Sequence, residues 1–137
     1  MGFVQAGKLA QYFAVSDAFV FHTLYDPFGL VLSEAMAAEL PVISSIYGMS
    51  THDLVAEGVT GFRIDPRQAQ SSARTIGHLL NLSLSDRQNM AQAAYERVLS
   101  CDSRISAAKI VHFLTSLCPS HKPGVTLIAG PSPHYVD

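Results

Sequence analysis

Residues 18–45, AFVFHTLYDPFGLVLSEAMAAELPVISS, decide how the chain folds. The apolar run Ala18–Phe21 is typical of a strand buried on both faces of a parallel sheet. Residues 22–28 hold turn-forming residues and predict a loop. Gly29–Ala38 is rich in helix formers, and Pro41–Ser45 predicts a second strand, since proline is tolerated at the first position of a strand. The stretch therefore predicts one strand–helix–strand unit.

The same kinds of pattern continue on both sides of this unit. Helices are expected at Lys8–Val15, Thr51–Glu57, Gln68–Leu80, Asp86–Leu99 and Ser103–Leu117, and a strand at Gly61–Ile64. Gly58 is expected to close the second of these helices, and Ser85 to cap the fourth. Alternating strands and helices predict an α/β fold, a Rossmann-like parallel sheet with flanking helices followed by C-terminal helices.

Length and composition predict a globular domain. The 137 residues are 48% hydrophobic and 15% charged, which suits a packed core. We expect one domain over residues 1–118, with a sheet part at 1–66 and a helical part at 67–118. The tail at 119–137 is rich in proline and glycine, so we expect it to be loosely ordered.

The net charge and the lengths of the apolar runs argue against some classes of protein. A net charge of −2 and a pI near 6.3 give no sign of a nucleic-acid partner. No leader pattern stands at the N-terminus, and the apolar runs are too short to span a bilayer. Cys101 and Cys118 lack metal-ligand spacing and are expected to be reduced, structural thiols. We therefore expect a cytoplasmic protein, with contact to a membrane surface left open.

A candidate site follows from the predicted sheet. Ligands of open parallel sheets bind beyond the carboxyl ends of the strands, where residues 22–28 and 46–50 form loops. Gly29 at a helix start lets an anion approach free N–H groups, which predicts a phosphate site. Glu34 lies about 7–8 Å further along the helix, within reach of a ribose next to that phosphate. Asp26 is placed to hold hydroxyls beyond the phosphates.

Plainer interpretations of these residues are open at this point. Asp26 fits the N-cap of the following helix, with Pro27 at its first position. Glu34 fits a solvated helix residue, and Gly29 a simple turn. No Walker A motif, G-x-S-x-G or D-x-D pair is present.

Three segments together resemble a known family: LAQYFAVSDAFVFHTLYDPFGLVLSEAMAAELPVISS, then YG, then DLVAEGVTGFRIDP. They are similar to the second half of the C-terminal, nucleotide-sugar-binding domain of retaining GT-B glycosyltransferases, family four, also called the glycosyltransferase group one type. The family has an acid, seven residues and then a glutamate, a spacing that Asp26 and Glu34 keep. The matching text covers about half of the chain.

The resemblance implies a role for each matched residue. Glu34 would bind the ribose hydroxyls, and Asp26 the hydroxyls of the donor sugar. The backbone of Phe28, Gly29 and Leu30 would meet the sugar and the diphosphate. The implied reaction transfers a sugar from a UDP-, GDP- or ADP-linked donor to a glycan or lipid acceptor with retention. It implies no cofactor and no metal.

The chain also departs from the family's pattern. Asp26 stands where glutamate is usual and is one methylene shorter. Glu39 replaces a usual glycine and is expected to take an unfavourable backbone angle. Met49 replaces the second residue of a Gly-Gly pair and would narrow the donor pocket.

The family's enzymes carry an N-terminal acceptor domain before the matched region. We therefore expect this chain to supply the donor-binding part and to need a missing domain or partner chain. The alternative is a non-catalytic, degenerate domain that pairs with an active glycosyltransferase. A weaker alternative is a nucleotide-sugar epimerase of GT-B fold.

Overall fold

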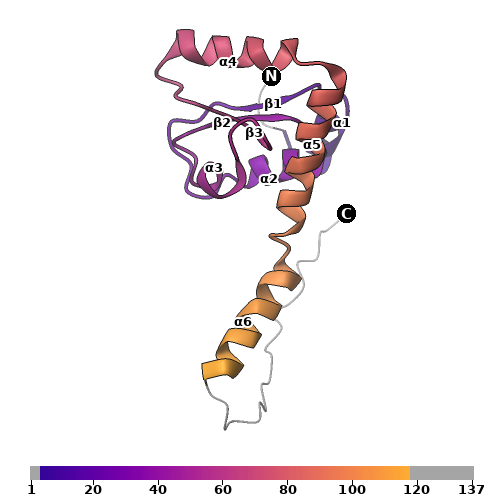
Figure 1. The fold of residues 1–137 in the computed structure, drawn as a ribbon, viewed down its shortest axis with the longest axis vertical. Coiled ribbons are helices and arrows are strands. Elements are labelled where there is room, and N and C mark those ends of the chain that lie inside the picture. The colour runs from indigo at the N-terminus through magenta and orange to yellow at the C-terminus, as the bar shows by residue number, and fades with distance from the viewer. Residues whose placement is uncertain (1–3, 118–137) are drawn as a thin grey trace. The chain divides into compact units, whose positions relative to one another are not determined.

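The computed structural model describes residues 4–117. Within them a three-stranded parallel sheet has the order β1-β2-β3 (Figure 1). The strands are β1 (Phe19–Phe21), β2 (Val42–Ser45) and β3 (Gly61–Ile64). The helices are α1 (Ala6–Ala14), α2 (Leu30–Ala37), α3 (Met49–Leu54), α4 (Ala69–Asn81), α5 (Leu84–Leu99) and α6 (Ser103–Leu117). The predicted α/β class and parallel sheet are confirmed.

The chain divides into two compact units, and the boundary in the sequence falls between Asp102 and Ser103. The first holds the sheet with α1–α5, and the second holds α6. The predicted loose tail at 119–137 lies outside the described residues. Among the helices that the structure describes, none has the length and apolar character needed to cross a membrane.

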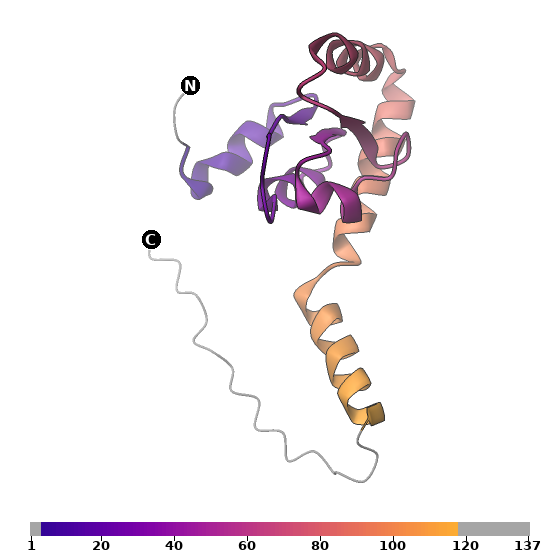
Figure 2. The same cartoon turned by 90° about the vertical axis from the view of Figure 1, so that its left-hand side faces the viewer.

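Each face of the sheet has its own apolar cluster. Successive strand residues point to opposite faces, so the neighbours Val42 and Ile43 belong to different clusters. Val42 packs with Leu32 and Met36 of α2, whereas Ile43 packs with Leu79 of α4. Figures 1 and 2 show α4 on one side of the strands, with α2 and α3 on the other. These two layers fix the strand ends that carry the candidate site.

The expectation that Ala18–Phe21 is buried on both faces is wrong for Val20. Its side chain is 39% exposed. β1 is an outer strand of the described sheet, and Val20 faces the same side as Ile43. On that side α4 packs against β3, at the opposite edge of the sheet. Val20 therefore keeps contact with solvent.

Most helix boundaries differ from the prediction by one to three residues, and side-chain hydrogen bonds explain two of the differences. α3 ends at Leu54, because the Thr60 hydroxyl donates to the Leu54 carbonyl (3.0 Å) and accepts from the Ala56 N–H (2.8 Å). Gly58 has φ of 72° in the turn that follows and does not cap the helix. α5 is capped by Ser83, not Ser85, because the Ser83 hydroxyl accepts from the Asp86 N–H at 3.1 Å.

The expectation for Glu39 is confirmed. It has φ of 56°, the left-handed region that glycine adopts without steric cost. Glu39 follows α2, and its N–H donates to the Met36 carbonyl at 3.1 Å. The non-glycine residue therefore stores backbone strain at the turn into β2.

Candidate functional site

The loops that follow β1 and β2 lie side by side at the carboxyl edge of the sheet. The Asp26 N–H donates to the Tyr47 carbonyl (3.4 Å), and the Met49 N–H donates to the Asp26 carbonyl (3.0 Å). The Ile46 N–H donates to the Ile64 carbonyl at 2.9 Å, which joins the second loop to the end of β3. The structure thus brings together the two loops that the sequence placed at this edge.

Asp26 organises the turn into α2. Its Oδ1 atom accepts hydrogen bonds from the Phe28 N–H at 2.9 Å and from the Gly29 N–H. The helix itself begins at Leu30 with Gly29 in the N-cap position, so Asp26 closes the preceding turn and Pro27 lies outside the helix. The interpretation of Asp26 as the N-cap of α2, with Pro27 at the first helical position, is therefore wrong, because the Asp26 carboxylate binds the N–H groups of the turn that precedes the helix. Both contacts use Oδ1, and the side chain is half-buried.

Position 29 requires a glycine, because of its backbone conformation and because of the atoms that surround it. Its φ of 57° and ψ of 38° lie in the left-handed region. A Cβ atom there would lie 2.2 Å from the Ser50 hydroxyl oxygen and 3.3 Å from the Phe21 ring. The Ser50 hydroxyl also donates to the Gly29 carbonyl at 3.3 Å. The start of α2 is thus packed directly against the start of α3.

The start of α2 presents backbone donors to this edge. The first N–H groups of an α-helix have no intrahelical partner, and the helix dipole favours an anion beside them. Phe28 and Leu30 flank Gly29, and their side chains are 75% and 69% exposed. Of the three backbone groups that the sequence singled out, those of Phe28 and Gly29 bind Asp26, whereas Leu30 is the first helical residue. Leu30 is therefore the position best suited to meet an anion.

Glu34 lies in the middle of α2 with its side chain exposed. It borders a groove of about 310 Å³ between α1 and α2, whose apolar lining includes Leu9 and Phe13. Within residues 4–117 the Glu34 carboxylate has no hydrogen-bond or ion-pair partner. An exposed carboxylate beside an apolar groove can accept hydroxyl hydrogen bonds from a ligand whose ring lies in the groove. The structure does not join Glu34 to Asp26 by any contact.

Sequence reasoning missed a group of side chains beyond the end of β3. The Asp65 carboxylate accepts from the Arg67 N–H (3.0 Å) and from the Gln68 side-chain amide (3.1 Å). The bond from the Arg67 backbone, followed by side-chain bonds from Gln68 and Tyr47, holds the pKa of Asp65 below its ordinary value of 3.8. The Arg67 guanidinium also stacks over the Tyr47 ring at 4.5 Å from its centroid. No short motif marks this group, because its members meet only through the fold.

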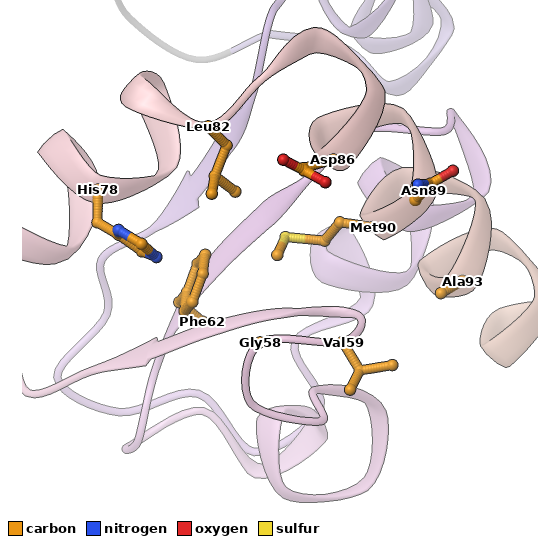
Figure 3. A pocket seen from close by; sticks show the side chains of 9 residues that line it. All are labelled: Gly58, Val59, Phe62, His78, Leu82, Asp86, Asn89, Met90 and Ala93. Atoms are coloured by element: carbon orange, nitrogen blue, oxygen red, sulfur yellow. The ribbon is translucent and has the colours of Figure 1, made fainter.

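A second pocket, of about 470 Å³, lies on another part of the unit (Figure 3). It is formed by the turn before β3 and by α4 and α5, so it opens toward the amino end of β3 and not toward the carboxyl edge. Two of its polar side chains have structural partners. Asp86 accepts from the Ser83 hydroxyl (2.7 Å), and His78 meets the edge of Phe62 at 5.2 Å between ring centroids. We therefore place the candidate site at the carboxyl edge.

Comparison with known proteins identifies the family of the chain. The family described as glycosyl transferases group 1 matches residues 1–97, which contain both the carboxyl edge and the pocket between α4 and α5. The chain belongs to this family. Its fold is that of the GT-B donor-binding domain, in agreement with the resemblance noted from the motifs.

The individual relatives that the chain matches are larger proteins. A sucrose synthase of Nitrosomonas europaea is 34% identical over 99 residues, which are 69% of this chain and 12% of the relative. The solved sucrose-phosphate synthase of Thermosynechococcus elongatus is 27% identical with a TM-score of 0.70, over 88% of this chain and 30% of the other. Anabaena Alr3699/HepE, solved in complex with UDP-glucose, is 27% identical with a TM-score of 0.66, over 85% and 31%. The chain therefore spans a third or less of the length of each.

Proposed function

We propose that this chain forms the donor-binding part of a retaining glycosyltransferase that uses a UDP-linked sugar. The observation that carries the proposal is the turn from Asp26 to Leu30. It combines a carboxylate, a left-handed glycine and the start of a helix at the carboxyl edge of a parallel sheet. UDP is favoured over GDP and ADP because the similar Anabaena protein was solved with UDP-glucose.

In the proposed binding mode, each part of the site contacts a different part of the donor. The diphosphate lies at the start of α2, where the Leu30 N–H and the helix dipole stabilise its charge. Glu34 accepts hydrogen bonds from the ribose hydroxyls, with the nucleoside along the α1–α2 groove. Asp26 keeps its Oδ1 on the turn and accepts from a hydroxyl of the donor sugar through Oδ2. Its fixed Oδ1 contacts hold the carboxylate in place before the donor binds.

The proposed reaction breaks the bond between the anomeric carbon of the sugar and the terminal oxygen of the diphosphate. The acceptor hydroxyl oxygen forms the new bond to the anomeric carbon on the same face of the sugar and gives its proton to the departing diphosphate. Negative charge develops on the departing diphosphate, which the positive end of α2 stabilises most strongly at that moment. A glycan or lipid acceptor would be bound mainly by parts of the enzyme outside this chain. We place the reaction in the cytoplasm.

A non-catalytic donor-domain homologue is the second candidate. The observation that favours it is the open edge at β1, which pairs only with β2 among the described strands. Such an edge suits pairing with a strand of another chain or of a longer polypeptide. This alternative keeps the fold but predicts no affinity for nucleotide sugars.

Calorimetric titration with UDP, UDP-glucose, GDP and ADP tests the proposal. We expect UDP and UDP-glucose to bind, and Glu34→Ala to weaken both by about 1–3 kcal/mol, since hydrogen bonds to a charged group are lost. Glu96→Ala is the matched control, because Glu96 is an exposed glutamate on α5. Equal affinities for wild type and Glu34→Ala would contradict the ribose role. Absence of binding by any nucleotide would favour the non-catalytic candidate.

A further inference from the structure

The loop at residues 46–50 forms the link between β3 and the Asp26 turn. On one side it is held by the bond from the Ile46 N–H to the Ile64 carbonyl, 2.9 Å long. On the other side Tyr47 and Met49 exchange backbone hydrogen bonds with Asp26. Any movement of this loop therefore moves the backbone of Asp26 as well.

The side chain of Tyr47 is fixed from the end of β3. The Arg67 guanidinium lies 4.5 Å from the centre of the Tyr47 ring, a distance suited to a cation–π contact. Arg67 is itself held, because its N–H donates to the Asp65 carboxylate at 3.0 Å. Asp65, Arg67 and Tyr47 thus form one cluster, which we call the β3-end clamp.

We infer that Arg67 is a positioning residue of the donor site, acting through Tyr47. The stacked guanidinium holds the Tyr47 loop against Asp26, and Asp26 in turn sets the Phe28–Gly29 backbone at the start of α2. The inference rests on the proposed function, because positioning has a meaning only if a donor binds there. It adds a residue that lies beyond the acid–glutamate motif and 41 positions after Asp26 in the sequence.

A purely structural role for Arg67 predicts different results. Arg67 is exposed, and one exposed cation–π contact contributes a small part of the stability of a domain. Loss of the side chain should therefore leave the fold intact. If Arg67 is only a solvent-exposed surface residue, its loss should change neither the affinity for the donor nor the hydrogen exchange of the Tyr47 loop.

The test uses the full chain with four variants: Arg67→Ala, Arg67→Lys, Tyr47→Phe and Arg74→Ala. Arg74→Ala is the matched control, because Arg74 is an exposed arginine on α4 and its loss changes the net charge equally. Affinity for UDP-glucose is measured by calorimetry, and exchange of the Met49 amide hydrogen is measured by NMR without ligand. Thermal unfolding shows that each variant is folded.

We expect Arg67→Ala to weaken UDP-glucose binding about 2- to 5-fold, the range that corresponds to one exposed cation–π contact. The Met49 amide should exchange faster, because its bond to Asp26 depends on the loop. Arg67→Lys should restore part of both effects, and Tyr47→Phe should bind like the wild type because it keeps the ring. Arg74→Ala should change neither quantity.

Four outcomes would overturn the inference. Wild-type affinity and exchange in Arg67→Ala would show that the clamp does not position the site. An equal loss in Arg74→Ala would assign the effect to net charge. If Glu34→Ala loses affinity while Arg67→Ala does not, the inference fails and the proposed function stands. If the wild type binds no nucleotide, both fail together.

Discussion

Replacing Gly29 by alanine tests the geometry at the start of α2. The left-handed backbone at φ of 57° costs a non-glycine residue about 1–2 kcal/mol. The new Cβ would also lie 2.2 Å from the Ser50 hydroxyl oxygen, so Ser50 must rotate and give up its bond to the Gly29 carbonyl. That loss adds about 0.5–1.5 kcal/mol. We therefore expect Gly29→Ala to lower the free energy of unfolding by about 2–3 kcal/mol.

Urea denaturation of the full chain measures this change. Gly77→Ala is the matched control, because Gly77 lies inside α4 and a Cβ there meets no atom within 4 Å. It should raise the free energy of unfolding by about 0.5–1 kcal/mol. The single variant Ser50→Ala should lose only the part due to the hydrogen bond to the Gly29 carbonyl, so its difference from Gly29→Ala gives the backbone part. Wild-type stability in Gly29→Ala would refute the reasoning, since neither the left-handed angle nor the close contact could then be real.

Three further predictions follow from single residues. Glu39→Gly should raise the free energy of unfolding by about 1 kcal/mol, since it relieves the positive φ; an unchanged urea midpoint would contradict this. Asp26→Asn should keep the fold, because its amide oxygen can still accept from Phe28 and Gly29, but should weaken UDP-glucose binding; equal calorimetric affinities would contradict the sugar role. The depressed pKa of Asp65 stabilises the fold above its ordinary value of 3.8, and this contribution is lost as the pH falls through the lower folded pKa. The free energy of unfolding of Asp65→Asn should therefore change less with pH in that acid range. A change with pH equal to that of the wild type would contradict the stabilising role of the Asp65 carboxylate.

Local patterns were sufficient to predict most of the fold. Gly61–Ile64 and Ser103–Leu117 were predicted with the bounds that the structure shows. The first alternates the apolar residues Phe62 and Ile64 with Arg63 after a glycine, a local pattern that is typical of a strand. The α5 cap was missed although Ser83 and Asp86 stand at capping-box spacing. That spacing alone does not decide the cap, because Ser85 and Gln88 show it as well.

Other features depended on contacts that no local pattern records. α3 ends at Leu54 because Thr60, six residues later, binds its carbonyl. Val20 is exposed because β1 is an outer strand of the described sheet.

In the candidate site, too, some contacts join residues that are neighbours in the sequence, whereas others join residues that only the fold brings together. The turn of Asp26 against Phe28 and Gly29 is local, but the sequence predicted an N-cap at Asp26, whereas the helix begins three residues later, after Gly29. The contact of Ser50 with Gly29 spans 21 residues, and that of Arg67 with Tyr47 joins the ends of two strands. Neither has a sequence signature, so both became visible only once the sheet order was known.

Mapping UDP-glucose onto the chain by NMR tests the central claim most directly. The amide signals of residues 4–117 would be followed during a titration, with the pocket between α4 and α5 as an internal comparison. The account predicts saturable changes that are largest at Leu30 and Glu34, with none at Phe62 or His78. Changes centred on Phe62 and His78, or no saturable change along α2, would contradict the assignment of the donor site to the carboxyl edge.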